Sequence, residues 1–241
     1  MKKQLRWAAA LLLLFTLFCS CKASVPLELD DGAGTVYQYE MPQDGDTIAI
    51  LHTVQGDITV RFFPKEAPKA VKNFIALAEQ GFYDGKLFFR TINNFIIQSG
   101  SPTNTAMGGE SIWGGYFEDE FSPKLHHLRG ALCMANSGID TNGSQFFIVQ
   151  AKTLSSSYED ELPETQKENA NYGYTQKIID AYQSSGGCPW LDQQHTVFGQ
   201  VIDGLDVVDL IARSRTGSDD RPIADIVIRS VEITTYSNSS R

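Results

Sequence analysis

Short apolar runs separated by turn residues restrict the fold of this sequence more than any other feature. The runs are "LFFRTI", "FIIQSG", "GALCMAN", "SQFFIVQA", "HTVFGQVI" and "DIVIRSVEI", each bounded by Gly, Asn, Pro or Asp. Residues 46–63 predict a hairpin, because apolar and polar residues alternate on both sides of a turn at Gln55–Asp57. Many short strands with turn signals between them predict a closed antiparallel sheet, and we interpret it as a barrel.

Two segments have helical rather than strand spacing. The first is an apolar stripe that ends before Gly81, where a helix C-terminal glycine belongs, and it consists of Val71, Phe74, Ile75 and Ala78. The second stripe is shorter and consists of Val207, Leu210 and Ile211. We predict an all-β barrel with one of these helices over each open end.

A polar segment at residues 154–189 interrupts the strand pattern and reads as an insertion. It contains a helical patch, "YTQKIIDAYQ", with Tyr174, Ile178 and Tyr182 on one face. A loop of this length that carries its own helix is compatible with a compact domain. Two roles stay open: the insertion selects protein substrates, or it covers the flank of the barrel.

The N-terminus has the pattern of an export signal. A basic start, "MKKQLRW", is followed by the apolar run "WAAALLLLFTLF", which is too short to span a bilayer. Ser20 before Cys21 resembles a bacterial lipobox, which predicts a signal peptide at 1–20 and a lipid on Cys21; the alternative is an ordinary signal peptide that leaves Cys21 free. The lipid would hold the protein on a membrane of the bacterial cell envelope. We expect a tether at 21–45, one domain at 46–236 and a tail at 237–241.

Composition and motifs exclude several classes of function. The formal net charge of −9 argues against a nucleic-acid partner, whose phosphates require a basic surface. No nucleophile elbow or phosphate-binding glycine loop is present, and the histidines lack metal-ligand spacing. His126 and His127, adjacent on a predicted strand, should point to opposite faces. We therefore expect no metal and no cofactor.

Two cysteines remain in the predicted domain, Cys133 and Cys188. An exported protein permits a disulfide between them, but Cys133 lies in an apolar run that equally suits a buried free thiol.

Polar side chains stand inside the apolar runs and require an explanation. They are Arg90, Gln98, Asn136, Gln145 and His195, and their apolar neighbours are Phe95, Ile96, Phe147, Trp190 and Leu191. Arg is rarely buried without partners, so either Arg90 extends its charged end to solvent or these groups form the wall of an apolar pocket.

The order of four motifs resembles the cyclophilin-type peptidyl-prolyl cis-trans isomerases. The motifs are "FFRTINNFIIQSG", "GESIWG...FEDEF", "GALCMANSGIDTNGSQFFI" and "WLDQQHTVFGQV", within a resemblance that runs from about Asp46 to Ile233. The resemblance implies an eight-stranded closed antiparallel barrel capped by two helices. It also implies a monomeric enzyme that acts on Pro-containing polypeptides.

The resemblance assigns roles to particular positions. Arg90 takes the catalytic position, with Gln98 as its support and Phe95 beside it. The proline pocket falls on Phe95, Ile96, Phe147, Leu191 and His195. Contacts to the residue before proline fall on Ala135, Asn136 and Gln145. Trp190 stands where the family has the residue associated with cyclosporin sensitivity. Two functions stay open: an isomerase that assists the folding of exported proteins, or a binding module for Pro-containing segments with little turnover.

Overall fold

The computed structural model of the chain describes residues 35–154, 158, 162 and 172–238. The predicted signal segment at 1–20 and the predicted lipid site at Cys21 lie outside these residues. No helix within the described ranges is long and apolar enough to cross a bilayer.

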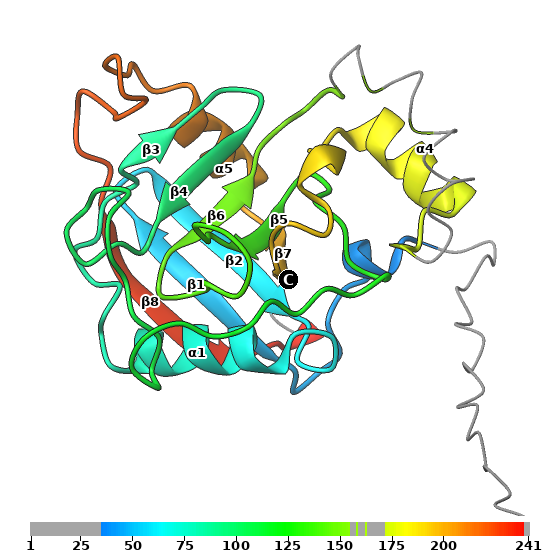
Figure 1. The fold of residues 1–241 in the computed structure, drawn as a ribbon, viewed down its shortest axis with the longest axis horizontal. Helices are drawn as coiled ribbons and strands as arrows, with labels where there is room; N and C mark the ends of the chain where they lie inside the picture. The colour runs from blue at the N-terminus through cyan, green and yellow to red at the C-terminus, as the bar shows by residue number, and fades with distance from the viewer. Residues whose placement is uncertain (1–34, 155–157, 159–161, 163–171, 239–241) are drawn as a thin grey trace, which may run out of the picture.

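One curled antiparallel sheet forms the centre of the molecule (Figure 1). Its strands are β1 (Thr47–Thr53), β2 (Gly56–Phe62), β3 (Arg90–Thr91), β4 (Ile96–Ser99), β5 (Ala131–Met134), β6 (Phe146–Val149), β7 (Val197–Asp203) and β8 (Ile228–Thr235). The spatial order is β3-β4-β6-β5-β7-β2-β1-β8. The sequence therefore predicts the strands correctly, including the hairpin of β1 and β2.

The sheet is not closed into a barrel by a continuous ladder, so the predicted closure is not confirmed. β3 and β8 are the two edges, and β3 has only two residues. Between the edges there is an isolated bridge of Leu87 with Val227, and the amide of Phe88 donates to the carbonyl of Ile226 at 2.9 Å. A strand as short as β3 cannot supply the remaining bonds of a closed ladder.

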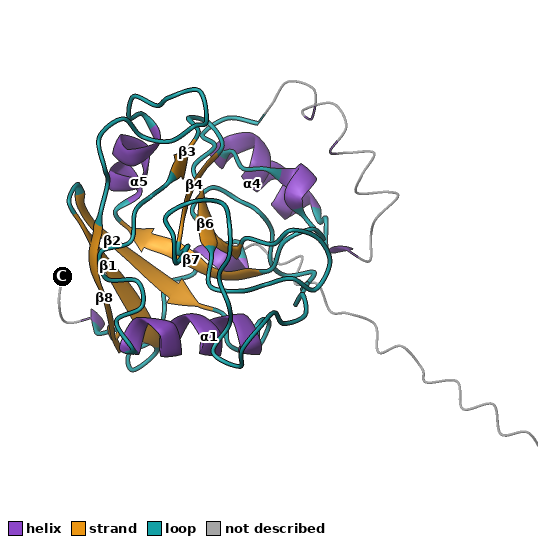
Figure 2. Ribbon diagram, turned by 60° about the vertical axis from the view of Figure 1, so that its left-hand side comes forward, coloured by secondary structure: helices purple, strands orange, loops and turns teal. Residues whose placement is uncertain are grey.

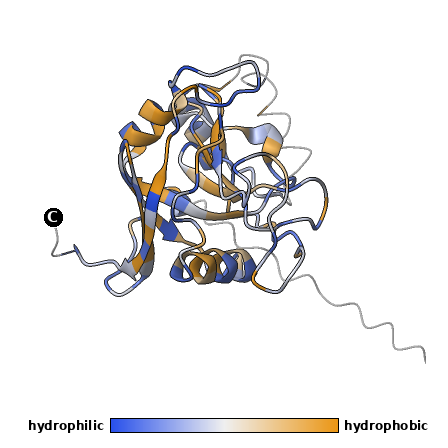
Figure 3. Cartoon of the chain, turned by 90° about the vertical axis from the view of Figure 1, so that its left-hand side faces the viewer, coloured by the Kyte–Doolittle hydropathy of each residue, from blue (hydrophilic) through white to orange (hydrophobic). Residues whose placement is uncertain are grey.

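Both predicted capping helices are present. α1 (Pro68–Glu79) lies under one end of the sheet, and α5 (Leu205–Ala212) lies near the other end (Figures 1 and 2). Gly81 has a φ of 70°, the left-handed conformation expected directly after a helix. Phe74 of α1 is fully buried and its ring lies 4.8 Å from that of Tyr83 and 5.4 Å from that of Phe146. Figure 3 shows α5 as mostly hydrophobic, in agreement with its buried residues Val208 and Ile211.

An acidic side chain joins α5 to the sheet. Both carboxylate oxygens of Asp209 accept hydrogen bonds of 3.0 Å from Nη2 of Arg129, and Gln150 donates to one of them at 2.8 Å. Burial would raise the pKa of Asp209, but the hydrogen bonds from Lys152, Gln150 and Arg129 lower it. The ionised carboxylate therefore holds α5 against Arg129, Gln150 and Lys152.

Part of the region predicted to be a tether packs against the rest of the domain. Residues Tyr37–Tyr39 form a short 3-10 helix, η1, within the region predicted to be a tether. Gln38 is fully buried; its Nε2 donates to the carbonyl of His126 at 2.8 Å, and its Oε1 accepts from the amide of His126 at 2.6 Å. A single buried amide produces no periodicity, so the sequence pattern gave no sign of this contact.

The insertion packs a helix against the flank of the domain. α4 (Gln176–Ser185) confirms the predicted helical patch, and Thr175 caps it by accepting a hydrogen bond from the amide of Ile178. Its buried face joins an apolar cluster with Leu128 and Leu154. The chain then turns through η3 (Pro189–Leu191) back toward β7.

Candidate active site

The polar and apolar site residues lie together because strands alternate their side chains. Arg90 of β3 pairs directly with Gln98 of β4, and Gln98 pairs with Phe147 of β6. Directly paired residues project from the same face of a sheet. The turn between β3 and β4 includes Asn93 and Asn94, and Asn94 adopts a left-handed φ of 57°. This hairpin therefore places Arg90, Gln98 and Phe147 on one face.

An open cavity of about 320 Å³ lies on this side of the sheet. Its lining residues are Arg90, Gln98, Ala106, Gly108, Gly109, Tyr116, Ala135, Asn136, Ser137, Thr141, Gly143 and Gln145. Five of the predicted site residues are therefore neighbours around one cavity: Arg90, Gln98, Ala135, Asn136 and Gln145.

Gln98 supports a different neighbour from the one predicted. Its Nε2 donates to Oε1 of Gln145 at 3.1 Å, and Nε2 of Gln145 donates to the carbonyl of Gly108 at 2.6 Å. Among the described residues, Arg90 and Gln98 share no side-chain hydrogen bond. The two glutamines instead form a chain of amides along the cavity wall.

The carboxylate partner of Arg90 is Asp220, which lies outside every motif that the sequence offers. Nε of Arg90 lies 3.6 Å from Oδ2 of Asp220, and the amide of Thr91 donates to the carbonyl of Asp220 at 2.9 Å. The Nη groups of Arg90 have no hydrogen-bond partner within the described part of the chain, and the side chain is 36% exposed. The guanidinium thus has one side near a carboxylate and the other free to meet a ligand.

The apolar residues predicted for a proline pocket form one cluster next to this cavity. Ile96, Phe147 and Leu191 are buried in it, and Phe95 and Trp190 lie at its edge. The rings of Phe95 and Trp190 stack at 6.0 Å. The rings of His195 and Phe147 are nearly perpendicular, with their centroids 5.3 Å apart. All the predicted pocket residues are therefore in the same region.

Asn136 lines the cavity, and its side chain is engaged by neighbouring residues. Nδ2 of Asn136 donates to the carbonyl of Gln194 at 2.8 Å and to Oδ1 of Asp119 at 3.2 Å. The backbone N–H and C=O of Asn136 bond to no other described residue. The preceding Ala135 donates its amide to the carbonyl of Gln145 at 3.0 Å. An extended peptide in the cavity could therefore pair with Asn136 as an added strand.

The side chain of His195 is neutral and lies beside the predicted pocket. Burial, together with the nearby His127, lowers the pKa of His195 to about 4. Its Nδ1 is buried and has no hydrogen-bond partner among the described residues. The imidazole therefore carries no charge near neutral pH and acts as a mostly apolar ring beside Phe147.

The prediction that His126 and His127 point to opposite faces is wrong. They lie in a loop rather than a strand, and Nδ1 of each ring contacts the same carboxylate, that of Asp192, at 2.9 and 2.7 Å. Loop backbone lacks the strict alternation of a strand, which allows the two rings to converge. Within the described ranges, no group of His, Cys, Asp and Glu side chains could hold a metal ion.

Cys133 and Cys188 are free thiols, buried in the same cluster as Phe147 and Leu191. Burial raises the pKa of both thiols, and the negative charge of Asp192 raises it further. Both sulfurs therefore stay protonated and contribute as small apolar groups.

Comparison with known proteins agrees with this arrangement. The family model described as cyclophilin type peptidyl-prolyl cis-trans isomerase matches residues 48–233. A Staphylococcus aureus (strain USA300) protein named "Putative peptidyl-prolyl cis-trans isomerase" is 52% identical over 192 residues, which cover 79% of this chain and 93% of that protein. A Staphylococcus epidermidis protein of the same name is 49% identical over the same length.

A solved structure also matches the fold. It is the crystal structure of a Cryptosporidium parvum cyclophilin type peptidyl-prolyl cis-trans isomerase in the presence of the dipeptide Ala-Pro, and it is 32% identical. The TM-score is 0.61, and the match covers 79% of this chain and 99% of the other.

We predict that His195 makes the stability of the domain depend on pH below neutrality. Its pKa is about 4 in the folded state, against about 6.5 when unfolded, so the unfolded chain binds more protons between these values. The stabilisation is complete above about pH 6.5 and is lost as the pH falls toward 4. Between pH 7 and pH 4, the free energy of unfolding measured in urea should fall by about 1–3 kcal/mol more in the wild type than in His195→Asn. Equal losses in both proteins would show that folding does not lower the pKa of His195.

Proposed function

Because this chain belongs to the cyclophilin-type peptidyl-prolyl cis-trans isomerases, we propose that its active site is the cavity beside Arg90. The observation that carries this proposal is the juxtaposition of a partly free guanidinium with an apolar cluster. Arg90 lines the cavity, and Phe147 pairs with Gln98, the strand partner of Arg90. A prolyl ring on the cluster would bring its own nitrogen close to Arg90.

The reaction requires the twisted amide to be stabilised more than the planar one. Rotation about an X–Pro bond breaks amide resonance and has a barrier of about 18–20 kcal/mol. In the twisted state the prolyl nitrogen regains a lone pair and can accept a hydrogen bond. An interaction that exists only in that state lowers the barrier.

Arg90 suits this role because a guanidinium stays charged and presents its N–H groups in a rigid fork. Asp220 lies on the Nε side at 3.6 Å, which leaves the Nη groups for the prolyl nitrogen. No covalent intermediate or proton transfer to a side chain is needed. Phe95 lies at the edge of the cluster that would receive the prolyl ring.

The remaining site residues would hold the substrate while the bond turns. The cluster of Ile96, Phe147 and Leu191, with Phe95 and His195 beside it, would take the pyrrolidine ring. The backbone of Asn136 would bind the residue before proline. The Cryptosporidium parvum relative, crystallised with Ala-Pro, supports a short Ala-Pro substrate for this chain as well.

We predict that Arg90→Ala lowers kcat/KM for a short Ala-Pro peptide by about 10²–10³-fold, since it removes the donor used in the transition state. Arg90→Lys should recover only a small part, because a single ammonium lacks the fork. Arg229→Ala, at an exposed position on β8, is the matched control and should keep wild-type activity. Wild-type rates in Arg90→Ala with peptide binding retained would instead favour a binding module with little turnover.

We further propose that Trp190 makes the enzyme sensitive to cyclosporin, because its ring stacks on Phe95 at the edge of the cluster. Cyclosporin should inhibit the wild type, and Trp190→Ala should weaken inhibition by at least about tenfold. Trp113→Ala, which removes a tryptophan that does not line the cavity, serves as the control. Equal inhibition of all three proteins would exclude Trp190 as a cyclosporin contact.

We also propose that a lipid on Cys21 tethers the enzyme to a membrane of the cell envelope, where it assists the folding of exported proteins. The support is the lipobox-like sequence that ends at Cys21. In a bacterial host the full chain should partition into the detergent phase of Triton X-114, and Cys21→Ser should move it to the aqueous phase. Detergent partitioning that is unchanged in Cys21→Ser would contradict the lipid.

A further inference from the structure

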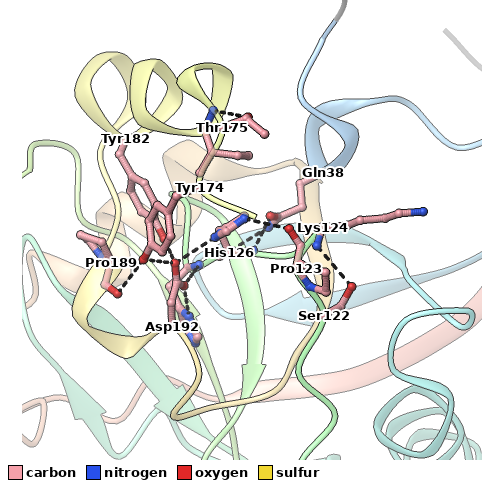
Figure 4. A network of polar contacts seen from close by, with 12 residues as sticks. Gln38, Ser122, Pro123, Lys124, His126, Tyr174, Thr175, Tyr182, Pro189 and Asp192 are labelled. Carbon is pink, nitrogen blue, oxygen red and sulfur yellow. Dashed lines mark hydrogen bonds and ion pairs between the residues drawn. The ribbon is translucent and has the colours of Figure 1, made fainter. Parts of the chain in front are cut away.

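A buried carboxylate lies at the centre of the chain segment that forms one wall of the pocket. Asp192 lies between Leu191 and His195, and its side chain is only 5% exposed (Figure 4). Oδ1 accepts hydrogen bonds from the amide and Nδ1 of His127 at 2.8 and 2.7 Å. Oδ2 accepts from Nδ1 of His126 at 2.9 Å and from the hydroxyls of Tyr174 and Tyr182 at 2.6 and 2.8 Å.

These contacts keep the carboxylate charged although it is buried. Burial alone would raise the pKa of Asp192, but the two histidines beside it hold that pKa far below its usual range. A buried charge is stable only when donors surround it. Each of the donors to Asp192 therefore helps to keep the 189–195 segment in place.

The same segment carries three of the pocket residues. Trp190 and Leu191 precede Asp192, and His195 follows it by one tight turn, in which the amide of Gln194 donates to the carbonyl of Leu191 at 3.0 Å. The turn includes Gln193 at a positive φ of 62°. A shift of Asp192 would therefore move Trp190, Leu191 and His195 together.

His127 also links Asp192 to Phe147, a buried residue of the pocket. Its ring stacks on Phe147 at 6.0 Å with an interplanar angle of 17°, and its centroid lies 6.2 Å from that of His195. Because Asp192 holds both the amide and the ring of His127, the carboxylate also determines what lies behind Phe147.

Two of the five donors come from the insertion. Tyr182 is on α4 and Tyr174 lies just before it, and both side chains are buried. Figure 4 shows the two phenol rings approaching Asp192 from the same side. A helix that merely covered the barrel could bury Phe at these positions. Two hydroxyls on one carboxylate link the insertion to the pocket wall.

We propose that Tyr174 and Tyr182 are positioning residues for the proline pocket, acting through Asp192 on the segment that carries Trp190, Leu191 and His195. The insertion thereby sets the shape of the pocket for the prolyl ring and its flanking residue. This inference rests on the proposed active site at Arg90.

The test compares Tyr174→Phe/Tyr182→Phe with Ile179→Val in the full chain. The double variant removes two hydroxyls and keeps both rings, and it should lower kcat/KM for an Ala-Pro peptide by about tenfold through misplacement of the pocket wall. Ile179→Val trims a buried residue of the same helix that does not contact Asp192, and it should keep wild-type kcat/KM. Thermal unfolding of each variant measures its stability, and Tyr174→Phe alone replaces the double variant if that protein does not fold.

A spectroscopic readout separates positioning from simple stabilisation. The indole ¹H–¹⁵N signal of Trp190, assigned with Trp190→Phe, should shift in the tyrosine variant and stay in place in Ile179→Val. Wild-type kcat/KM with an unmoved Trp190 signal in the tyrosine variant would overturn the inference. An equal loss of activity in Ile179→Val would also overturn the inference, because the loss would then follow from a less stable α4 and not from a displaced pocket wall.

Arg90→Ala is measured in parallel, so that failure of the positioning role can be distinguished from failure of the proposed active site. Loss of activity in Arg90→Ala together with full activity in the tyrosine variant rejects only the positioning role. Full activity in Arg90→Ala rejects the active site on which the positioning role depends.

Discussion

The alternation of side chains along β4, β6 and β5 is the constraint on which the rest of the structure depends. Ile97, Ile148 and Leu132 of these strands face the central core, which they share with buried residues of α1. The residues next to them in sequence, including Gln98, Phe147 and Cys133, project from the other face. One set of strands therefore builds both the core of the domain and the floor of the site. A change of register by one residue would exchange the two faces and destroy both.

Single carboxylates then hold the loops of the site and helix α5 in place. Asp220 approaches Arg90 from the loop before β8, and Asp119 binds the side chain of Asn136. Asp192 fixes the segment that carries His195, and Asp209 binds Arg129 and Gln150. The side chains of Asp119, Asp192 and Asp209 each accept hydrogen bonds from residues distant in the sequence, and Asp220 forms an ion pair with Arg90. Loops have no ladder of backbone bonds, so such multivalent acceptors determine where the loops lie.

The sequence predicted the strands and the capping helices, and the residues that it assigned to a site lie close together, but several contacts were predicted wrongly or not at all. Gln98 was expected to support Arg90, and it bonds to Gln145 instead. The two adjacent histidines were expected to diverge, and they converge on Asp192. The sheet was expected to close, and it stays open beside the two-residue strand β3. All three errors concern partners between segments, which no local pattern of residues specifies.

By itself the sequence determined what depends on near neighbours along the chain: the period of each strand and helix, the hairpin of β1 and β2, and the motifs that identify the family. These features follow from backbone preferences and from the cost of exposing apolar side chains. Only the tertiary structure decided which acceptor each buried donor meets, including the meeting of Tyr174 and Tyr182 with Asp192. Pairing across the fold depends on distances in space, and a buried polar group can be satisfied by any suitable partner that the packed chain brings within reach.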